Sequence, residues 1–397
     1  MPAQGKVEFL KAERETAAHE VIVIGAGAIG LSIGWRLAQR GVRTVVLEAE
    51  QAAHGATGVA AGMLAPVTEA DFGEEALIAL NLAGLGRWPA FAADLQRTSG
   101  IDSGYRETGT LTVAVDRDEE EILRRMHGYQ RSLGLDARWL SARECRALEP
   151  GLAPRIAGGI DAPHDHQVSP RLLAQGLVAA LEAAGGELRT CTRVARLVLR
   201  PGSVSVELAD GDCLDADAVV IAAGAESATL AGVPEPERVP VRPVKGQILR
   251  LRARAPVTLP ARRVIRTPEV YAVPREDGHL VVGATVEERG WDRSVTAGGV
   301  LELLRRAYEV LPGVIELELV EAAAGLRPAT PDNGPVVGES ETRGLWWATG
   351  HWRNGILLAP LTAEAIATAL TGEEPPEEFA PFGPQRFATA ARAEVAG

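Results

Sequence analysis

Strand and helix patterns alternate along the first part of the chain. An apolar run at residues 21–24 predicts a buried strand, residues 31–37 continue as a helix, and residues 43–48 predict a second strand. This order is a βαβ unit, whose right-handed crossover makes the two strands parallel. Residues 74–95 then show helical periodicity with acidic residues in the first turn. We therefore expect a parallel α/β sheet at the start of the fold.

The pattern changes after residue 99. Residues 111–115 predict a strand, and residues 119–133 predict an amphipathic helix. A short helix is expected at residues 141–148, with Ser141 as its N-cap and Glu144 at the capping-box position. These elements indicate the first piece of a second domain.

The chain then returns to the first domain. Residues 170–184 predict a helix that ends at a pair of glycines, and residues 187–199 predict extended structure. Residues 217–225 repeat the order of buried strand and small residues found near residue 25. The first domain is therefore expected to be discontinuous.

A hairpin is predicted later in the chain. Apolar runs at residues 270–273 and 280–283 flank a turn at residues 276–278, which indicates an antiparallel sheet. Residues 300–311 predict a helix, and residues 361–370 predict the last one.

The first candidate chemistry lies in the glycine cluster after the first strand. Gly25, Gly27 and Gly30 have the spacing for a tight turn, a close approach to pyrophosphate and helix packing. Glu48 ends the next strand, where its carboxylate can accept from both ribose hydroxyls and would repel a 2′-phosphate. This context predicts a dinucleotide site and disfavours NADP. The alternative is a glycine-rich packing turn.

A second anion-binding feature lies far along the chain. Residues 350–355 form a polar, glycine-bracketed loop that runs into an apolar, helix-like segment. Unpaired N–H groups at such a helix start can hold a phosphate or a cofactor ring that becomes anionic. With the small-residue segments 55–64 and 222–225, the chain has more cofactor-like loops than a nicotinamide dinucleotide usually requires. FAD is therefore favoured.

Composition narrows the classes of partner. The 397 residues are 46% hydrophobic and 24% charged, which fits a globular protein with more than one core. A net charge of −12 opposes binding to nucleic acid or to an anionic membrane. No run of residues approaches eighteen uninterrupted apolar positions, so no membrane span is expected. A small-molecule partner is favoured.

Cysteine and histidine usage adds little further chemistry. Cys145, Cys191 and Cys213 are widely spaced, which suggests neither disulfides nor a thiolate metal site and favours a reducing, cytoplasmic location. His164 and His166 form the one close pair of histidines, and we interpret them as loop polarity, so no metal is expected.

The chain resembles the glycine oxidase (ThiO-type) branch of the D-amino-acid oxidase superfamily of FAD amine oxidoreductases. The resemblance covers residues 20–372, and the loop at 350–360 is specific to this branch. The other matching segments are 21–30 with Glu48, 60–64, 243–246, 281–285 and 325–328.

The resemblance implies an α/β fold: an FAD-binding, Rossmann-like domain of the glutathione-reductase type with a second, α+β substrate domain built on an antiparallel sheet. The expected division is a disordered extension at 1–19, the FAD-binding domain at 20–98, 151–235 and 325–375, the substrate domain at 99–150 and 236–324, and a tail at 376–397.

Carried over by residue, the resemblance makes Arg327 the anchor for a substrate carboxylate and Tyr271 a hydroxyl donor to the same group. A guanidinium offers two parallel N–H bonds to a carboxylate, which agrees with that role. A structural ion pair for Arg327 and simple strand packing for Tyr271 are the alternatives. Met63 and Val286 are candidates to line the pocket or fill the core. Arg353 could reach the flavin or the substrate, or be an exposed loop arginine.

The resemblance also implies noncovalent FAD, because no cysteine falls in the matching segments. Some relatives carry a histidine where this chain has Glu269, which leaves the pocket entrance and the breadth of substrates open. The residues expected to contact the cofactor are Gly25, Gly27, Ala28, Ile29, Gly30, Glu48, Thr57, Ala61, Gly62, Met63, Val168, Ala223, Gly224, Gly350, Arg353, Asn354, Gly355, Ile356 and Leu357.

The implied reaction is oxidation of glycine, sarcosine or small D-amino acids by O₂ to an imine and H₂O₂. The resemblance also implies a role in thiamine biosynthesis and a homotetramer. Two alternatives stay open: a D-amino-acid dehydrogenase that uses another electron acceptor, and a noncatalytic FAD-binding protein.

Overall fold

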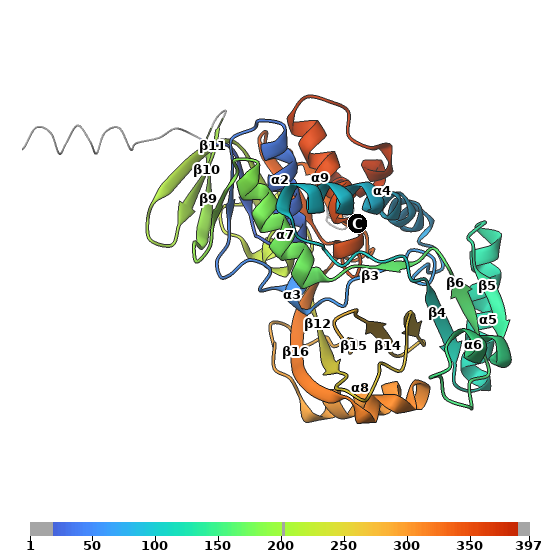
Figure 1. Cartoon of the computed structure of the whole chain (residues 1–397). Helices are drawn as coiled ribbons and strands as arrows, with labels where there is room; N and C mark the ends of the chain where they lie inside the picture. The colour runs from blue at the N-terminus through green and yellow to red at the C-terminus, as the bar shows by residue number, and fades with distance from the viewer. Residues whose placement is uncertain (1–18, 201–202, 388–397) are drawn as a thin grey trace, which may run out of the picture.

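The structure is a computed structural model that describes residues 19–200 and 203–387 (Figure 1). Nearly all of the extension expected at 1–19, and residues 388–397 of the tail, lie outside the described residues. The part of the tail that is described packs on the body, since Phe379 and Phe382 of η4 (Glu377–Phe382) are buried. Two eight-stranded sheets organise the described chain.

The first sheet has the parallel centre that the sequence predicts. Its path runs β17-β18-β11-β1-β2-β8, and β9 and β10 extend β11 as an antiparallel ribbon. β1 pairs in parallel with both β2 and β11, which confirms the βαβ unit and the later return to this sheet. The strands are β1 (His19–Ile24), β2 (Thr44–Leu47), β8 (Glu187–Arg189), β9 (Val194–Arg200), β10 (Ser203–Leu208), β11 (Cys213–Ile221), β17 (Val336–Glu339) and β18 (Leu345–Thr349).

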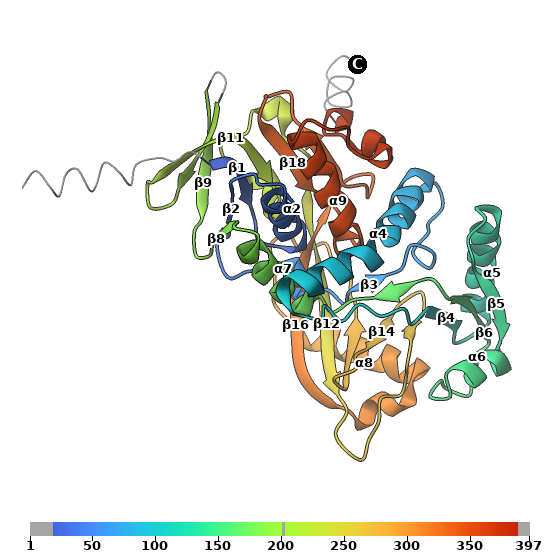
Figure 2. The same cartoon turned by 45° about the horizontal axis from the view of Figure 1, so that its top comes forward.

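On one face of this sheet lie four helices, of which three contact its strands and the fourth, α4, packs on two of those three (Figure 2). β1 supplies both faces, because side chains alternate along a strand: Val21 and Val23 pack toward the helices, and Ile22 and Ile24 pack on the opposite side. The helices are α2 (Ala28–Gln39), α4 (Glu75–Ser99), α7 (Pro170–Ala183) and α9 (Gly355–Leu370).

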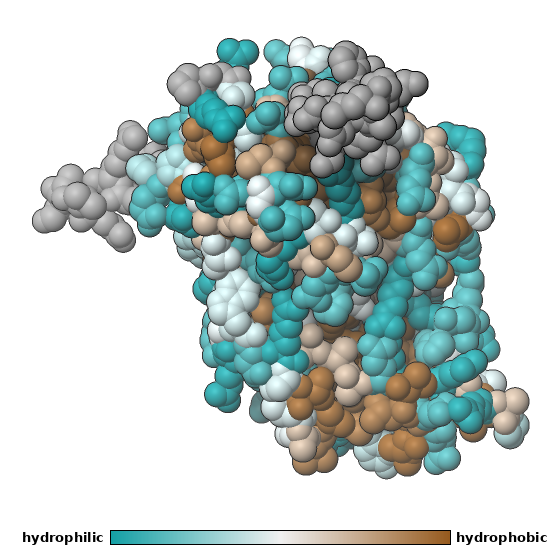
Figure 3. Space-filling model, turned by 90° about the vertical axis from the view of Figure 1, so that its left-hand side faces the viewer, coloured by the Kyte–Doolittle hydropathy of each residue, from teal (hydrophilic) through white to brown (hydrophobic). Residues whose placement is uncertain are grey.

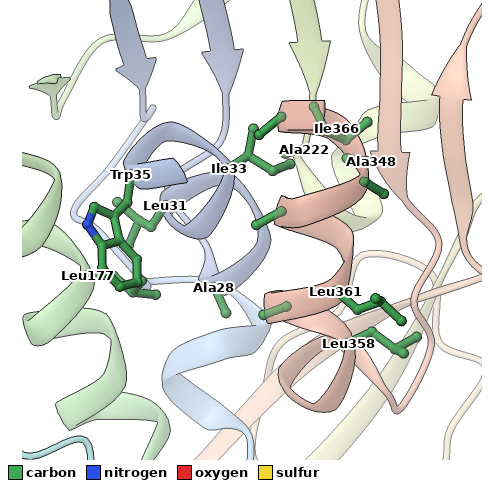
Figure 4. Close-up of a cluster of buried hydrophobic side chains, with 14 of the residues drawn as sticks. Ala28, Leu31, Ile33, Trp35, Leu177, Ala222, Ala348, Leu358, Leu361 and Ile366 are labelled. Carbon is green, nitrogen blue, oxygen red and sulfur yellow. The ribbon is translucent and has the colours of Figure 1, made fainter. Parts of the chain in front are cut away.

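Helices α2 and α9 lie side by side at the centre of this layer (Figure 4). Leu31 and Leu361 are fully buried there, and Trp35 turns toward Leu177 of α7. Burying each leucine stabilises the fold by about 1.5–3 kcal/mol. α9 begins at Gly355, directly after the polar loop and earlier than the predicted 361–370.

Judged by length and composition alone, one helix of the described chain, α4, is long and apolar enough to cross a membrane. The core helix of a soluble protein passes the same test. In this fold α4 packs against α7 and α9, and Trp88, Phe91 and Leu95 are buried in the shared core.

The second sheet is antiparallel except where β13 pairs with β4, and its order is β16-β12-β15-β14-β13-β4-β6-β5. The predicted hairpin is its β14–β15 pair. The strands are β4 (Thr110–Ala114), β5 (Arg138–Ser141), β6 (Gly158–Ala162), β12 (Arg242–Arg252), β13 (Val264–Arg266), β14 (Tyr271–Pro274), β15 (His279–Gly283) and β16 (Glu318–Ala329).

Three predicted helices accompany this sheet: α5 (Arg117–Ser132), α6 (Ala142–Leu148) and α8 (Ala297–Val310). The capping box of α6 is confirmed, since Ser141 and Glu144 bond reciprocally. Sheet membership departs from the expected division at two strands. β6 joins the second sheet although 151–235 was assigned to the first domain, and β16 extends to Ala329, past the boundary at 325. The remainder of the division stays a prediction.

Candidate functional site

A cavity of about 580 Å³ lies where the two sheets meet. Its walls come from the ends of β1 and β11, the starts of α2 and α9, and the strands β12, β14 and β16. The carboxyl ends of parallel strands are the usual place for a ligand in an open α/β sheet. The volume lies in the range of cofactor and small-molecule sites.

The glycine turn forms one end of this cavity. Gly25 has φ +106°, and a Cβ there would stand 2.6 Å from the Ala222 carbonyl oxygen. α2 begins at Ala28, and its N-cap, Gly27, has no side chain that could accept from the first turn, so the two N–H groups that follow Ala28 stay available to an anion. Thr57 Oγ1 accepts from Ala28 N at 3.0 Å and fixes the turn. The geometry fits a pyrophosphate.

Glu48 lines the same end, beside the turn. Its two oxygens accept from Ala26 N at 2.8 Å and from Glu50 N at 3.0 Å. A carboxylate has about four acceptor sites, so these two bonds orient the group and leave lone pairs for ribose hydroxyls.

Arg327 and Tyr271 lie together at the other end of the cavity. Arg327 Nη1 donates to the carbonyl oxygens of Thr285 at 3.1 Å and Lys245 at 3.4 Å. None of the ion pairs within residues 19–200 and 203–387 includes Arg327. Burial lowers the pKa of Arg327 and raises the pKa of Tyr271, and each partly offsets the shift of the other. The pair therefore presents a positive donor and a neutral phenol to an anion.

Two glycines give these side chains their room. A Cβ on Gly246 would stand 2.4 Å from Arg327 Nη1, and a Cβ on Gly283 would stand 2.5 Å from the Tyr271 hydroxyl oxygen. A larger residue at either position would therefore displace Arg327 or Tyr271. Both glycines fall in segments that carry the resemblance.

The loop before α9 closes the wall between the two ends. Trp352 has φ +48°, and its N–H donates to Pro328 O at 2.9 Å, which ties the loop to β16. The guanidinium carbons of Arg327 and Arg353 lie 5.8 Å and 5.9 Å from the centre of the Trp352 ring. Asn354 gives α9 no side-chain cap, so its first N–H groups remain open beside the cavity.

His351 lines the cavity and is buried, with Nε2 3.0 Å from Thr362 Oγ1. Burial lowers its pKa to about 3, so the imidazole is neutral at pH 7. Its contribution to stability is complete above about pH 6.5, the unfolded value, and is lost as pH falls toward 3. Between pH 7 and pH 5 the wild type should lose about 2 kcal/mol more unfolding free energy than His351→Asn. Urea denaturation at the two pH values measures this, and an equal loss in both proteins would contradict it.

Most of the expected site residues line the cavity, including Met63, Arg353 and the 61–63 segment. Five expected cofactor residues do not. Gly30 packs α2 against Gly25, where a Cβ would be 1.9 Å from the carbonyl oxygen, and Val168 N donates to Gly62 O at 2.9 Å. The other three that do not line it are Gly350, Asn354 and Leu357.

Two residues expected near the substrate lie elsewhere. Val286 is 65% exposed and does not line the cavity. Glu269 does not line it either, and its carboxylate pairs with Arg306 of α8. The sequence missed Glu69, Trp352, Glu226 and Arg293, which do line it. Glu69 and Trp352 lie close in sequence to the expected site residues Met63 and Arg353. This proximity is the one feature of the sequence that could have placed them in the site.

These residues fit FAD. The uncapped α2 terminus suits a pyrophosphate, Glu48 suits a ribose, and the α9 terminus suits a ring that gains negative charge. No cysteine lies among the lining residues. No group of three or more His, Cys, Asp or Glu suited to a metal occurs in the part of the chain that the structure describes.

Known proteins agree with this assignment. Residues 20–369 match the family described as FAD dependent oxidoreductase (DAO). The chain is 37% identical to the glycine oxidase of Geobacillus kaustophilus over 92% of its own length and 97% of that protein. It is 34% identical to the bifunctional protein ThiO/ThiG of Synechocystis sp., covering 93% of this chain and 54% of that protein.

Solved structures show the same fold. The crystal structure of the Geobacillus kaustophilus glycine oxidase superposes with a TM-score of 0.87 at 36% identity, covering 93% of this chain and 98% of that one. The iminodiacetate oxidase of Chelativorans sp. BNC1 gives 0.82 at 28% identity, covering 92% and 98%. The chain therefore belongs to the family of FAD-dependent oxidoreductases that includes the glycine oxidases.

Proposed function

We propose that this protein oxidises glycine, and other small amines such as sarcosine or small D-amino acids, to the imine and reduces O₂ to H₂O₂. Water then hydrolyses the imine to the 2-oxo acid and releases ammonia or, from sarcosine, methylamine. The main support is Arg327, a guanidinium without a carboxylate partner in the described chain, which faces the cavity beside Tyr271. The similarity to glycine oxidases over nearly the whole chain also supports this proposal.

The residues of the chain supply position and charge. When bound, FAD accepts two electrons from the amine carbon and passes them to O₂. Arg327 binds the substrate carboxylate through parallel N–H bonds, and Tyr271 donates its hydroxyl to the same group. The α9 N-terminus stabilises the negative charge that develops on the ring. This scheme requires no side-chain base, because the amine reacts in its neutral form.

The absence of a cysteine from the cavity lining supports noncovalent FAD. All three cysteines are free, with Cys191 and Cys213 exposed, which supports a reducing, cytoplasmic location. Similarity to the protein named ThiO/ThiG supports a role in thiamine biosynthesis.

We also propose a homo-oligomer, with four copies by resemblance. Figure 3 shows an apolar area at the end of the molecule where Figure 1 places α8 and the start of β16. Leu301 of α8, Leu319 and Val320 of β16, and Ile315 in the turn between these two elements are 47–68% exposed. β16 is also an edge strand of the second sheet. Exposed apolar area of this kind is typical of an interface.

The reaction is tested with glycine, sarcosine and D-alanine. Anaerobic glycine should bleach the flavin, and aerobic turnover should give one H₂O₂ per glycine consumed. Flavin reduction and dye reduction without peroxide would favour the dehydrogenase. No reduction by any of the three amines would favour the noncatalytic alternative.

A further inference from the structure

We propose that Lys245 is a positioning residue for the substrate carboxylate. Its ammonium latches the loop at residues 284–296, and this loop holds Arg327 through the Thr285 carbonyl. Lys245 itself does not line the cavity. The inference rests on the proposed function, because it assigns Arg327 to the substrate.

Lys245 lies on β12 and is 1% exposed. A buried ammonium needs a charged partner, since burial without one is costly. Lys245 Nζ lies 2.7 Å from Asp292 Oδ2 and 3.7 Å from Glu287 Oε2. Its hydrogen bond is the largest cause that lowers the pKa of Asp292. Both acids belong to the 284–296 loop, so one buried side chain holds two points of it.

Backbone and amide bonds fit the same loop against β12. Lys245 N donates to Glu287 O at 2.9 Å, and Glu287 N donates to Lys245 O at 3.0 Å. Gln247 N donates to Thr285 Oγ1 at 2.8 Å, and Gln247 Nε2 donates to Glu287 Oε1 at 2.7 Å. The Lys245–Asp292 pair extends this attachment to the outer part of the loop.

Arg327 depends on this attachment for its orientation. The acceptors of its guanidinium are the carbonyl oxygens of Thr285, which belongs to the loop, and of Lys245. Neutral carbonyls orient the guanidinium without neutralising it, so its charge stays available to a carboxylate. If the Lys245–Asp292 pair is broken, the loop and its Thr285 carbonyl can move, and the Arg327 guanidinium is no longer held in one orientation. Substrate binding should then weaken while the reaction of bound substrate persists.

The test compares Lys245→Met, Asp292→Asn and the double variant in the FAD-loaded enzyme. Each single variant should raise KM for glycine about tenfold with kcat changed less than threefold. The dissociation constant of glycolate, a carboxylate without an amine, should rise in parallel when followed by flavin absorbance. The double variant should be no worse than the worse single, because the pair acts as a unit.

Arg254→Met is the matched control. It breaks an exposed pair between Arg254, two residues after the end of β12, and Glu318 of β16, away from the loop, and should change neither constant. If Lys245→Met does not fold, Asp292→Asn carries the test alone. KM and the glycolate constant within twofold of wild type in Asp292→Asn would overturn the inference. Weaker glycolate binding in a protein that does not oxidise glycine would support the inference and refute the proposed function.

Discussion

Replacing Arg327 with Met should lower kcat/KM for glycine by at least about 100-fold. Each hydrogen bond to a charged group contributes about 1.5–3 kcal/mol, and about 2.7 kcal/mol corresponds to a factor of 100. The loss should appear mainly in KM, because the carboxylate is bound before and during the reaction. Steady-state oxygen uptake and glycolate titration measure it.

Arg327→Lys is the control for charge alone. Lysine keeps the positive charge and loses the planar pair of donors, so it should recover part of the activity and not all of it. Tyr271→Phe should cost about tenfold, since it removes one donor. A KM for Arg327→Met within threefold of wild type would exclude the anchor role.

Replacing Gly25 with Ala should produce a protein that is purified without flavin. The backbone at φ +106° is one that L side chains rarely adopt, and the new Cβ would stand 2.6 Å from the Ala222 carbonyl oxygen. The turn must then shift, and the N–H groups at the start of α2 no longer point at the pyrophosphate. FAD affinity should fall at least about tenfold, which corresponds to only about 1.4 kcal/mol.

Gly41→Ala serves as the comparison for Gly25→Ala. Gly41 also has a positive φ, +78°, but a Cβ there meets nothing within 4 Å, and it follows α2 at the helix end. This variant should keep its flavin. The ratio of flavin to protein absorbance and reconstitution of the apoprotein give the readouts. Normal flavin content in Gly25→Ala would show that the turn does not grip the cofactor.

Local features of the fold were predictable from the sequence. The βαβ unit, the capping box at Ser141 and the β14–β15 hairpin each depend on residues within one short stretch. The pairing of distant strands was not predictable, because the periodicity of side chains in one strand does not specify which other strand it pairs with. β6 therefore joined the second sheet unexpectedly, and no pattern indicated that β12 and β16 form one long ladder.

The candidate site divides in the same way. The glycine turn, Glu48 and the loop before α9 carry signals in their own spacing, and the structure brings them to one cavity. Glu269 illustrates the limit, because its ion-pair partner Arg306 lies on another element, which the sequence around Glu269 does not indicate. The partnership of Lys245 and Asp292 likewise exists only after β12 and the following loop are folded together.

The place of α9 in the helical layer has a consequence for biosynthesis. It packs between α2 and α4, although it is the last long helix in the described part of the chain and is therefore made after both of them. At about 5–20 residues per second, the earlier elements wait on the order of 20 seconds or more for it. Until then α2 and α4 can pack on α7, but the parts of their apolar faces that α9 covers stay open. Because the start of α9 lines the cavity, a growing chain can complete its FAD site only after α9 has been synthesised.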